Sequence, residues 1–109
     1  LHGSSAASDV YKRQMQQIAL QEQEYDSING SYFIQASCTP DDDTVAEINA
    51  DLFDVDEDEP VVLLDGYRVC VDSHVTGFEV KACKWDASED SCKEGEDMLT
   101  LNTKGGKNF

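Results

Sequence analysis

The chain has few basic residues and no long apolar run. Eight Lys and Arg residues stand against 23 Asp and Glu residues, which gives a formal net charge of −15 at pH 7. A field of this sign repels phosphate backbones and anionic lipid, so it argues against nucleic-acid binding and favours cations or basic molecules as partners. No stretch reaches the ~18–20 apolar residues of a membrane-spanning helix. No apolar signal-peptide segment stands near residue 1 either.

Residues that build catalytic sites are also sparse. The only histidines are His2 and His74, and no Gly-rich phosphate loop occurs. Asp72, Ser73 and His74 are neighbours on a predicted strand or turn, where their side chains diverge, so they do not make a catalytic triad. We therefore expect that the chain is not an enzyme.

The chain contains four cysteines but no C-x-x-C pair and no close Cys/His spacing of a zinc module. An even count in a small acidic domain predicts two disulfides and a location outside the cytosol. Three pairings are possible. We favour Cys83–Cys92, which closes a short loop, and Cys38–Cys70, which ties the segment after the helix to a central strand. Four free buried thiols are the alternative.

A helix is predicted over residues 15–28, because Met, Gln, Ala, Leu and Glu dominate there. Met15, Ile18, Tyr25 and Ile28 fall near one face, although Glu22 interrupts this stripe. Asn29-Gly30 ends the helix. Residues 1–14 resemble a translated adapter sequence, so we predict an appendage over 1–14 and a globular domain over 15–109. Native helical sequence is the alternative for residues 1–14.

Residues 31–109 are predicted to be rich in β-structure. Residues 31–37 read as a short strand or an extended connector, and Thr44 with Glu47 fits a capping box for a short helix over 45–53. Strands are predicted over residues 61–64, 67–71, 78–83 and 98–101, with a hairpin turn at Asp65-Gly66. The predicted fold class is α+β, with an N-terminal α-helix packed on a small antiparallel β-sheet and two disulfides.

The segment Glu24-Tyr25-Asp26-Ser27-Ile28-Asn29-Gly30-Ser31-Tyr32-Phe33 resembles the junction between helix and globular head in type IV pilins and minor pilins. Later segments follow in the same order as in that family. Gly77 to Ala82 resembles the strand before the closing loop, and the C-terminal region is matched by Asp90-Ser91-Cys92, Leu99-Thr100-Leu101 and Gly105-Gly106-Lys107. The resemblance covers residues 15–107. Residues 1–14 do not match the family's cleaved leader or its long apolar helix.

The resemblance implies the head domain of a pilin, a structural subunit of a type IV pilus or related filament that acts in assembly, adhesion or motility. A missing apolar helix would anchor the full-length subunit in the inner membrane and then pack in the filament core. The implied route leads through the periplasm to the cell surface, and the implied partners are other pilin subunits. A secretion pseudopilin is an alternative, and an unrelated secreted acidic binding module with disulfides is another.

Two surface features are candidate binding sites. Asp54, Asp56 and Asp58 alternate as at the start of a calcium loop, but Glu59-Pro60 replaces the expected Gly, and Asp65 stands where an EF-hand has Glu. A looser calcium site that also uses residues 41–43 is a hypothesis, with a solvated acidic face as the alternative; no other cofactor is expected. Trp85, inside the loop 83–92, is the expected contact residue. The alternative is that Trp85 folds back onto the sheet.

Overall fold

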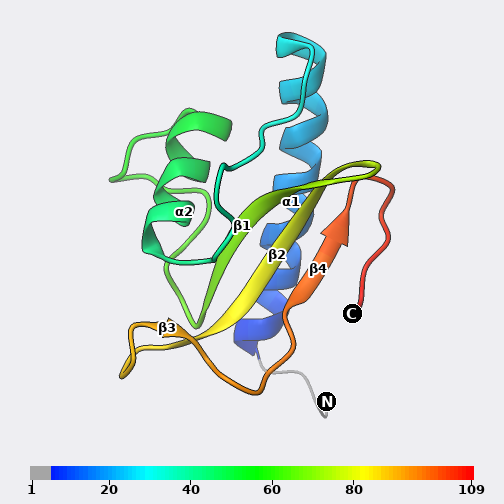
Figure 1. Ribbon diagram of the computed structural model, residues 1–109. Coiled ribbons are helices and arrows are strands. Elements are labelled where there is room, and N and C mark those ends of the chain that lie inside the picture. The colour runs from blue at the N-terminus through cyan, green and yellow to red at the C-terminus, as the bar shows by residue number, and fades with distance from the viewer. Residues whose placement is uncertain (1–5) are drawn as a thin grey trace.

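One long helix lies across one face of an antiparallel sheet in the computed structural model, which describes residues 6–109 (Figure 1). A short helical segment follows the long helix and precedes the sheet. The elements are α1 (Ala6–Asn29), α2 (Asp42–Glu47), η1 (Ile48–Leu52), β1 (Tyr67–His74), β2 (Gly77–Asp86), β3 (Ser91–Cys92) and β4 (Leu99–Asn102). The predicted α+β class, with an N-terminal helix, an antiparallel sheet and two disulfides, is confirmed.

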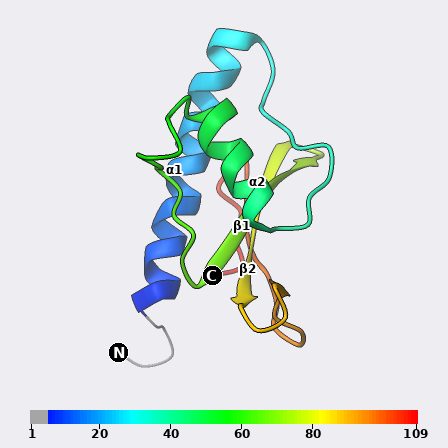
Figure 2. The same ribbon diagram turned by 90° about the vertical axis from the view of Figure 1, so that its left-hand side faces the viewer.

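The strand β2 is the centre of the sheet. It pairs antiparallel with β1 from Tyr67↔Lys84 to His74↔Gly77, and with β4 from Glu79↔Asn102 to Ala82↔Leu99. Its last residues pair with β3 through Trp85↔Cys92. The helix α1 packs on the sheet through a buried apolar cluster made of Tyr11, Met15, Ile18, Val69, Val71, Phe78, Val80 and Leu101. Figure 2 shows α1 on one side of the sheet, with α2 beside it.

The helix is longer than the predicted residues 15–28. Tyr11 is fully buried and lies four residues before Met15, so it continues the sheet-facing stripe. Its hydroxyl donates to the Leu63 carbonyl at 2.7 Å. Residues 6–14 therefore belong to the fold, and the packing shows no boundary at residue 14. The adapter origin of residues 1–14 stays a prediction, and residues 1–5, His2 among them, lie outside the described part.

Near the end of α1, the buried side chains are not the ones that were predicted. Ile28, expected near the core-facing stripe, is 73% exposed. The reason is that the last turns of α1 extend beyond the sheet (Figure 1). Glu22, which interrupts the stripe, is fully buried instead. No helix in residues 6–109 is long and apolar enough to cross a membrane.

The predicted strand over residues 61–64 and its hairpin at Asp65-Gly66 are wrong. This segment is an irregular stretch whose backbone groups bond to side chains from helices. Asn49 Oδ1 accepts from the amides of Val61 and Val62, Asn49 Nδ2 donates to the Val62 carbonyl, and Gln14 Oε1 accepts from the Leu63 amide. The hairpin joins β1 to β2 instead, and its turn lies between His74 and Gly77.

The short helix begins earlier than predicted. The capping residue is Asp41, whose Oδ1 accepts from the Thr44 amide at 2.8 Å, while Thr44 Oγ1 accepts from the Asp41 amide at 3.0 Å. The capping box predicted for Thr44 and Glu47 is therefore wrong, because Thr44 occupies the third helical position. Residues 31–37 form the extended connector, not a strand.

Parts of β1 and β4 are covered by other segments of the chain. On β1, the Gln35 amide donates to the Val71 carbonyl at 3.0 Å, and Gln35 Oε1 accepts from the Val71 amide at 2.9 Å. On β4, the Asn108 side chain and amide bond to Thr100, and Gly106 accepts from the Asn102 amide. The covered positions do not offer a template for adding a strand from another chain.

Candidate functional site

The two disulfides join the pairs of cysteines that the sequence favours. Cys38–Cys70 ties the connector after α1 to β1, and Cys83–Cys92 ties β2 to β3. All four cysteines are bonded, so no free thiol is present. Two disulfides in a domain of this size indicate an oxidising, extracellular or secreted environment.

Trp85 is half-buried and packs against β1. Its ring centroid lies 4.7 Å from Cζ of Arg68, the geometry of a cation–π contact. Arg68 Nε in turn donates to Asp42 Oδ1 at 2.6 Å, so the loop 83–92 is linked to the start of α2. The ring also lines a small hollow with Asp41, Asp43 and Asp90. The structure therefore places Trp85 folded toward the sheet, and its role in binding a partner stays a prediction.

The calcium candidates do not converge. Asp54, Asp56 and Asp58 lie exposed in the loop after η1, and residues 6–109 contain no group of three or more His, Cys, Asp or Glu side chains placed to hold a metal ion. Asp41 caps α2 and Asp42 pairs with Arg68, so these two carboxylates already have partners. Calcium binding stays an untested prediction.

The triad-like residues on β1 bind other groups. Asp72 Oδ2 accepts from Lys81 Nζ at 2.8 Å, and this contact lowers the pKa of Asp72 and raises the pKa of Lys81. His74 Nδ1 faces the Thr76 hydroxyl at 2.8 Å. Because Asp72 and His74 each have a different partner, the geometry offers no proton relay through Ser73.

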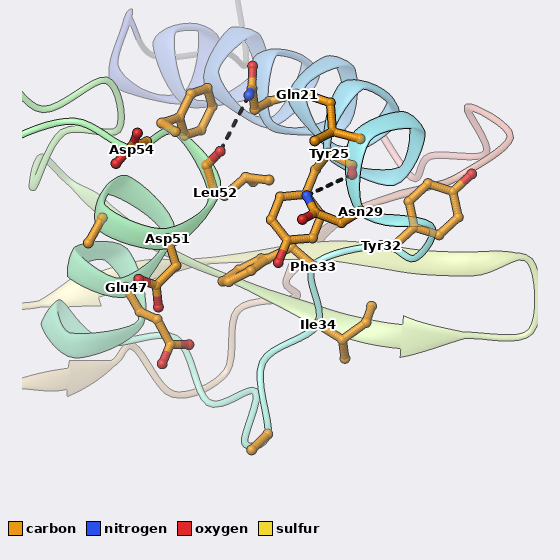
Figure 3. Close-up of a pocket in the computed structure, with 14 residues that line it drawn as sticks. Gln21, Tyr25, Asn29, Tyr32, Phe33, Ile34, Glu47, Asp51, Leu52 and Asp54 are labelled. Atoms are coloured by element: carbon orange, nitrogen blue, oxygen red, sulfur yellow. Dashed lines mark hydrogen bonds between the residues drawn. The ribbon is translucent and has the colours of Figure 1, made fainter.

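A groove lies between the C-terminal turns of α1, the connector and η1. It encloses about 980 Å³, and its apolar lining includes Tyr25, Phe33, Leu52 and Phe53. Tyr25 and Phe33 meet edge to face with centroids 5.9 Å apart. Figure 3 shows these rings between the helix and η1, and Gln21 Nε2 spans the two elements to the Leu52 carbonyl at 3.3 Å.

The rim of this groove is acidic. Glu47, Asp51 and Asp54 line the side formed by the end of α2, η1 and the loop after η1, and all three are exposed (Figure 3). The opposite side is apolar, with Ile28 73% exposed and Ile34 38% exposed. No Lys, Arg or His lines the groove. We call this site, with its apolar floor and its three carboxylates, the acidic groove.

Glu22 supports the groove from inside the protein. Its Oε1 accepts from the Phe33 amide at 2.7 Å, which holds the connector where Phe33 enters the groove. Its Oε2 is buried and has no hydrogen-bond partner among residues 6–109. Burial raises the pKa of Glu22 to about 7; the Phe33 amide lowers the pKa and the nearby Asp26 raises it further.

The acidic rim was not predicted from the sequence, although the spacing of its residues indicates it. Glu47, Asp51 and Asp54 are spaced by four and three residues, the spacing of one helix face. Their apolar counterparts, Ile28 and Ile34, come from a distant segment, so only the folded chain brings the two sides together. Comparison of the chain with protein-family models, curated proteins and solved structures finds no match.

Proposed function

We propose that the chain is the globular head of a type IV pilin or minor pilin, a structural subunit of a surface filament. The observation that carries the proposal is the order of the elements. A long helix of 24 residues leads through an extended connector and the short helical segment α2–η1 into an antiparallel sheet, and a disulfide closes the C-terminal loop. This order agrees with the pilin-like motifs at residues 24–33 and 77–107.

The proposed role is physical and not chemical. In the full-length subunit, an apolar segment upstream of α1 would anchor the subunit in the inner membrane and then pack in the filament core, with this head in the outer shell. The disulfides suit a head exposed to oxidising surroundings. The covered positions on β1 and β4 suit assembly through helices and side-chain surfaces, because they leave less free strand edge for pairing with another chain.

Two measurements test the proposal: the sequence of the gene upstream of this chain, and antibody labelling of surface filaments. Reading the gene upstream of α1, we expect a short leader and an apolar helix in frame with it. Antibodies against the loop 83–92 should then label surface filaments in electron micrographs of the source cells. A conventional cleaved signal peptide, or filaments that stay unlabelled, contradicts the proposal.

A secreted binding module is the second candidate. The observation that favours it is the acidic groove, because a hollow that combines aromatic side chains with three exposed carboxylates suits a basic ligand. The upstream sequence separates the two candidates. A cleaved signal peptide supports the secreted module, and an apolar helix supports the pilin.

A further inference from the structure

We infer that the acidic groove of one copy binds a basic patch on a second copy of this chain, in a head-to-tail contact. The basic patch consists of Lys12 and Lys107, which flank the Phe109 ring, together with Leu20. The inference rests on the proposed function, and it names the surfaces through which neighbouring heads touch.

The first step is the distribution of positive charge. Of the eight basic residues, four form the ion pairs Arg68–Asp42, Lys81–Asp72, Lys84–Glu96 and Lys93–Glu96. The other four make no ion pair within residues 6–109, and they are Lys12, Arg13, Lys104 and Lys107. These free cations belong to two segments only, the early turns of α1 and the C-terminal residues.

Contacts bring these two segments together. The Lys12 and Lys107 ammonium groups lie 5.7 and 5.2 Å from the centroid of the Phe109 ring. Both cations therefore flank one aromatic side chain. Lys107 also lines a shallow hollow between α1 and β4 with Leu20, which is 73% exposed. The basic patch thus combines cations with exposed apolar surface.

The acidic groove has the complementary chemistry. It presents Glu47, Asp51 and Asp54 beside the exposed Ile28 and Ile34, and no cation lines it. Because the chain carries a charge of −15, most of its surface repels the groove of another copy. The basic patch brings two of the unpaired cations of residues 6–109, Lys12 and Lys107, to one aromatic ring, so it is the surface that the groove attracts.

The geometry makes the contact heterologous. Two grooves repel each other because both carry carboxylates, so a contact between identical surfaces is disfavoured. The groove lies at the end of α1 that extends beyond the sheet, whereas the C-terminal residues lie along β4 (Figures 1 and 2). One copy can therefore use both surfaces at once, and a heterologous contact that does not close into a ring repeats along a filament.

The experiment is sedimentation velocity on the full chain, from micromolar to millimolar concentration. At low ionic strength we expect the weight-average mass to rise with concentration. At high ionic strength we expect the monomer, because salt screens exposed charges. A wild-type chain that stays monomeric over the whole range at low ionic strength overturns the inference.

Charge reversal identifies the two surfaces. A groove variant, Asp51→Lys with Asp54→Lys, and a patch variant, Lys12→Glu with Lys107→Glu, should each weaken self-association about tenfold or more. An equimolar mixture of the two should associate again, since each variant keeps one surface that fits the other. A mixture that stays monomeric overturns the inference.

Two control variants carry the same changes of charge at positions outside the acidic groove and outside the basic patch. Asp56→Lys with Asp58→Lys changes exposed carboxylates outside the groove, and Lys84→Glu with Lys93→Glu changes lysines outside the patch. Both should associate like the wild type, and circular dichroism should show all four variants folded. A control that weakens association as much as its partner variant contradicts the assigned surfaces.

The outcome separates this inference from the proposed function. One outcome is that the equimolar mixture of the two variants associates while antibodies against the loop 83–92 label no filament. This outcome supports the contact between heads and overturns the pilin proposal. Labelled filaments together with monomeric heads support the pilin proposal and overturn the contact.

Discussion

Glu22 is a buried carboxyl group that supports the acidic groove. Its side chain has no exposed surface, and one of its oxygens accepts from the Phe33 amide. An ionised carboxylate in this position lacks water and lacks a cationic partner, so the folded protein favours the neutral form. The conformation of the connector is thereby linked to the protonation of one side chain.

This linkage predicts how stability depends on pH. The pKa of Glu22 is about 7 in the folded protein, above the ordinary value of about 4.3 expected in the unfolded chain. The contribution of the neutral Glu22 side chain to the free energy of unfolding is therefore fully present below about pH 4. This contribution is lost as the pH rises through about 7. Glu22→Gln, which stays neutral, should raise the free energy of unfolding at pH 8 by about 2–3 kcal/mol relative to wild type.

Urea unfolding from pH 4 to pH 8 measures this effect, and Glu24→Gln on the exposed side of the same helix is the control. The control should follow the wild-type profile. If the free energy of unfolding of Glu22→Gln changes with pH in the same way as that of the wild type, the titration of Glu22 is not coupled to folding.

The hairpin between β1 and β2 depends on a glycine at the start of β2. Gly77 has φ +137°, a conformation that residues with a Cβ rarely adopt. A Cβ there would stand 2.7 Å from the Tyr32 ring and 2.8 Å from Thr103 Oγ1. The turn therefore packs directly against the junction after α1, where Tyr32 also meets Phe78 edge to face at 5.1 Å.

Gly77→Ala should therefore destabilise the protein by about 2–3 kcal/mol, through backbone strain together with the steric conflict. Gly95→Ala is the matched substitution, since Gly95 has φ +80° with open space around it. Only the conformational penalty applies there, about 1 kcal/mol. Urea unfolding compares the two, and equal losses of stability would show that the contact with Tyr32 does not matter.

At the scale of the whole molecule, the two disulfides link separate parts of the fold. Cys38–Cys70 joins residues 32 apart and connects the segment after α1 to the sheet, whereas Cys83–Cys92 joins residues only nine apart. In the chain-entropy model, the longer loop restricts the unfolded chain more. The bond at the connector therefore contributes more to stability than the bond at the C-terminal loop.

Removing each bond tests this ranking. Cys38→Ala with Cys70→Ala should lower the free energy of unfolding by about 4 kcal/mol, and Cys83→Ala with Cys92→Ala by about 3 kcal/mol. Urea unfolding of the two double variants under the same oxidising conditions measures the difference. A larger loss for the second variant would mean that the short loop makes native contacts beyond its restriction of the unfolded chain.

The sequence by itself determined the fold class and the end of α1 at Asn29-Gly30. These follow from local composition and a helix-stop signal, which act over short stretches of chain. The even cysteine count predicted two disulfides, but it left three pairings possible, and the folded chain decided between them. The strand over residues 78–83 was also predicted, because alternating apolar and charged residues indicate a half-exposed strand.

The tertiary structure decided which polar groups meet. Residues 61–64 form an apolar run that suits a strand, but Asn49 and Gln14 bind its backbone groups, so it becomes an irregular segment. Glu22 became a buried carboxyl group because the connector returns over α1. The acidic groove joins Ile28 to Asp51 across the fold. Local patterns select elements, whereas hydrogen-bond partners and charged surfaces arise only when distant segments pack together.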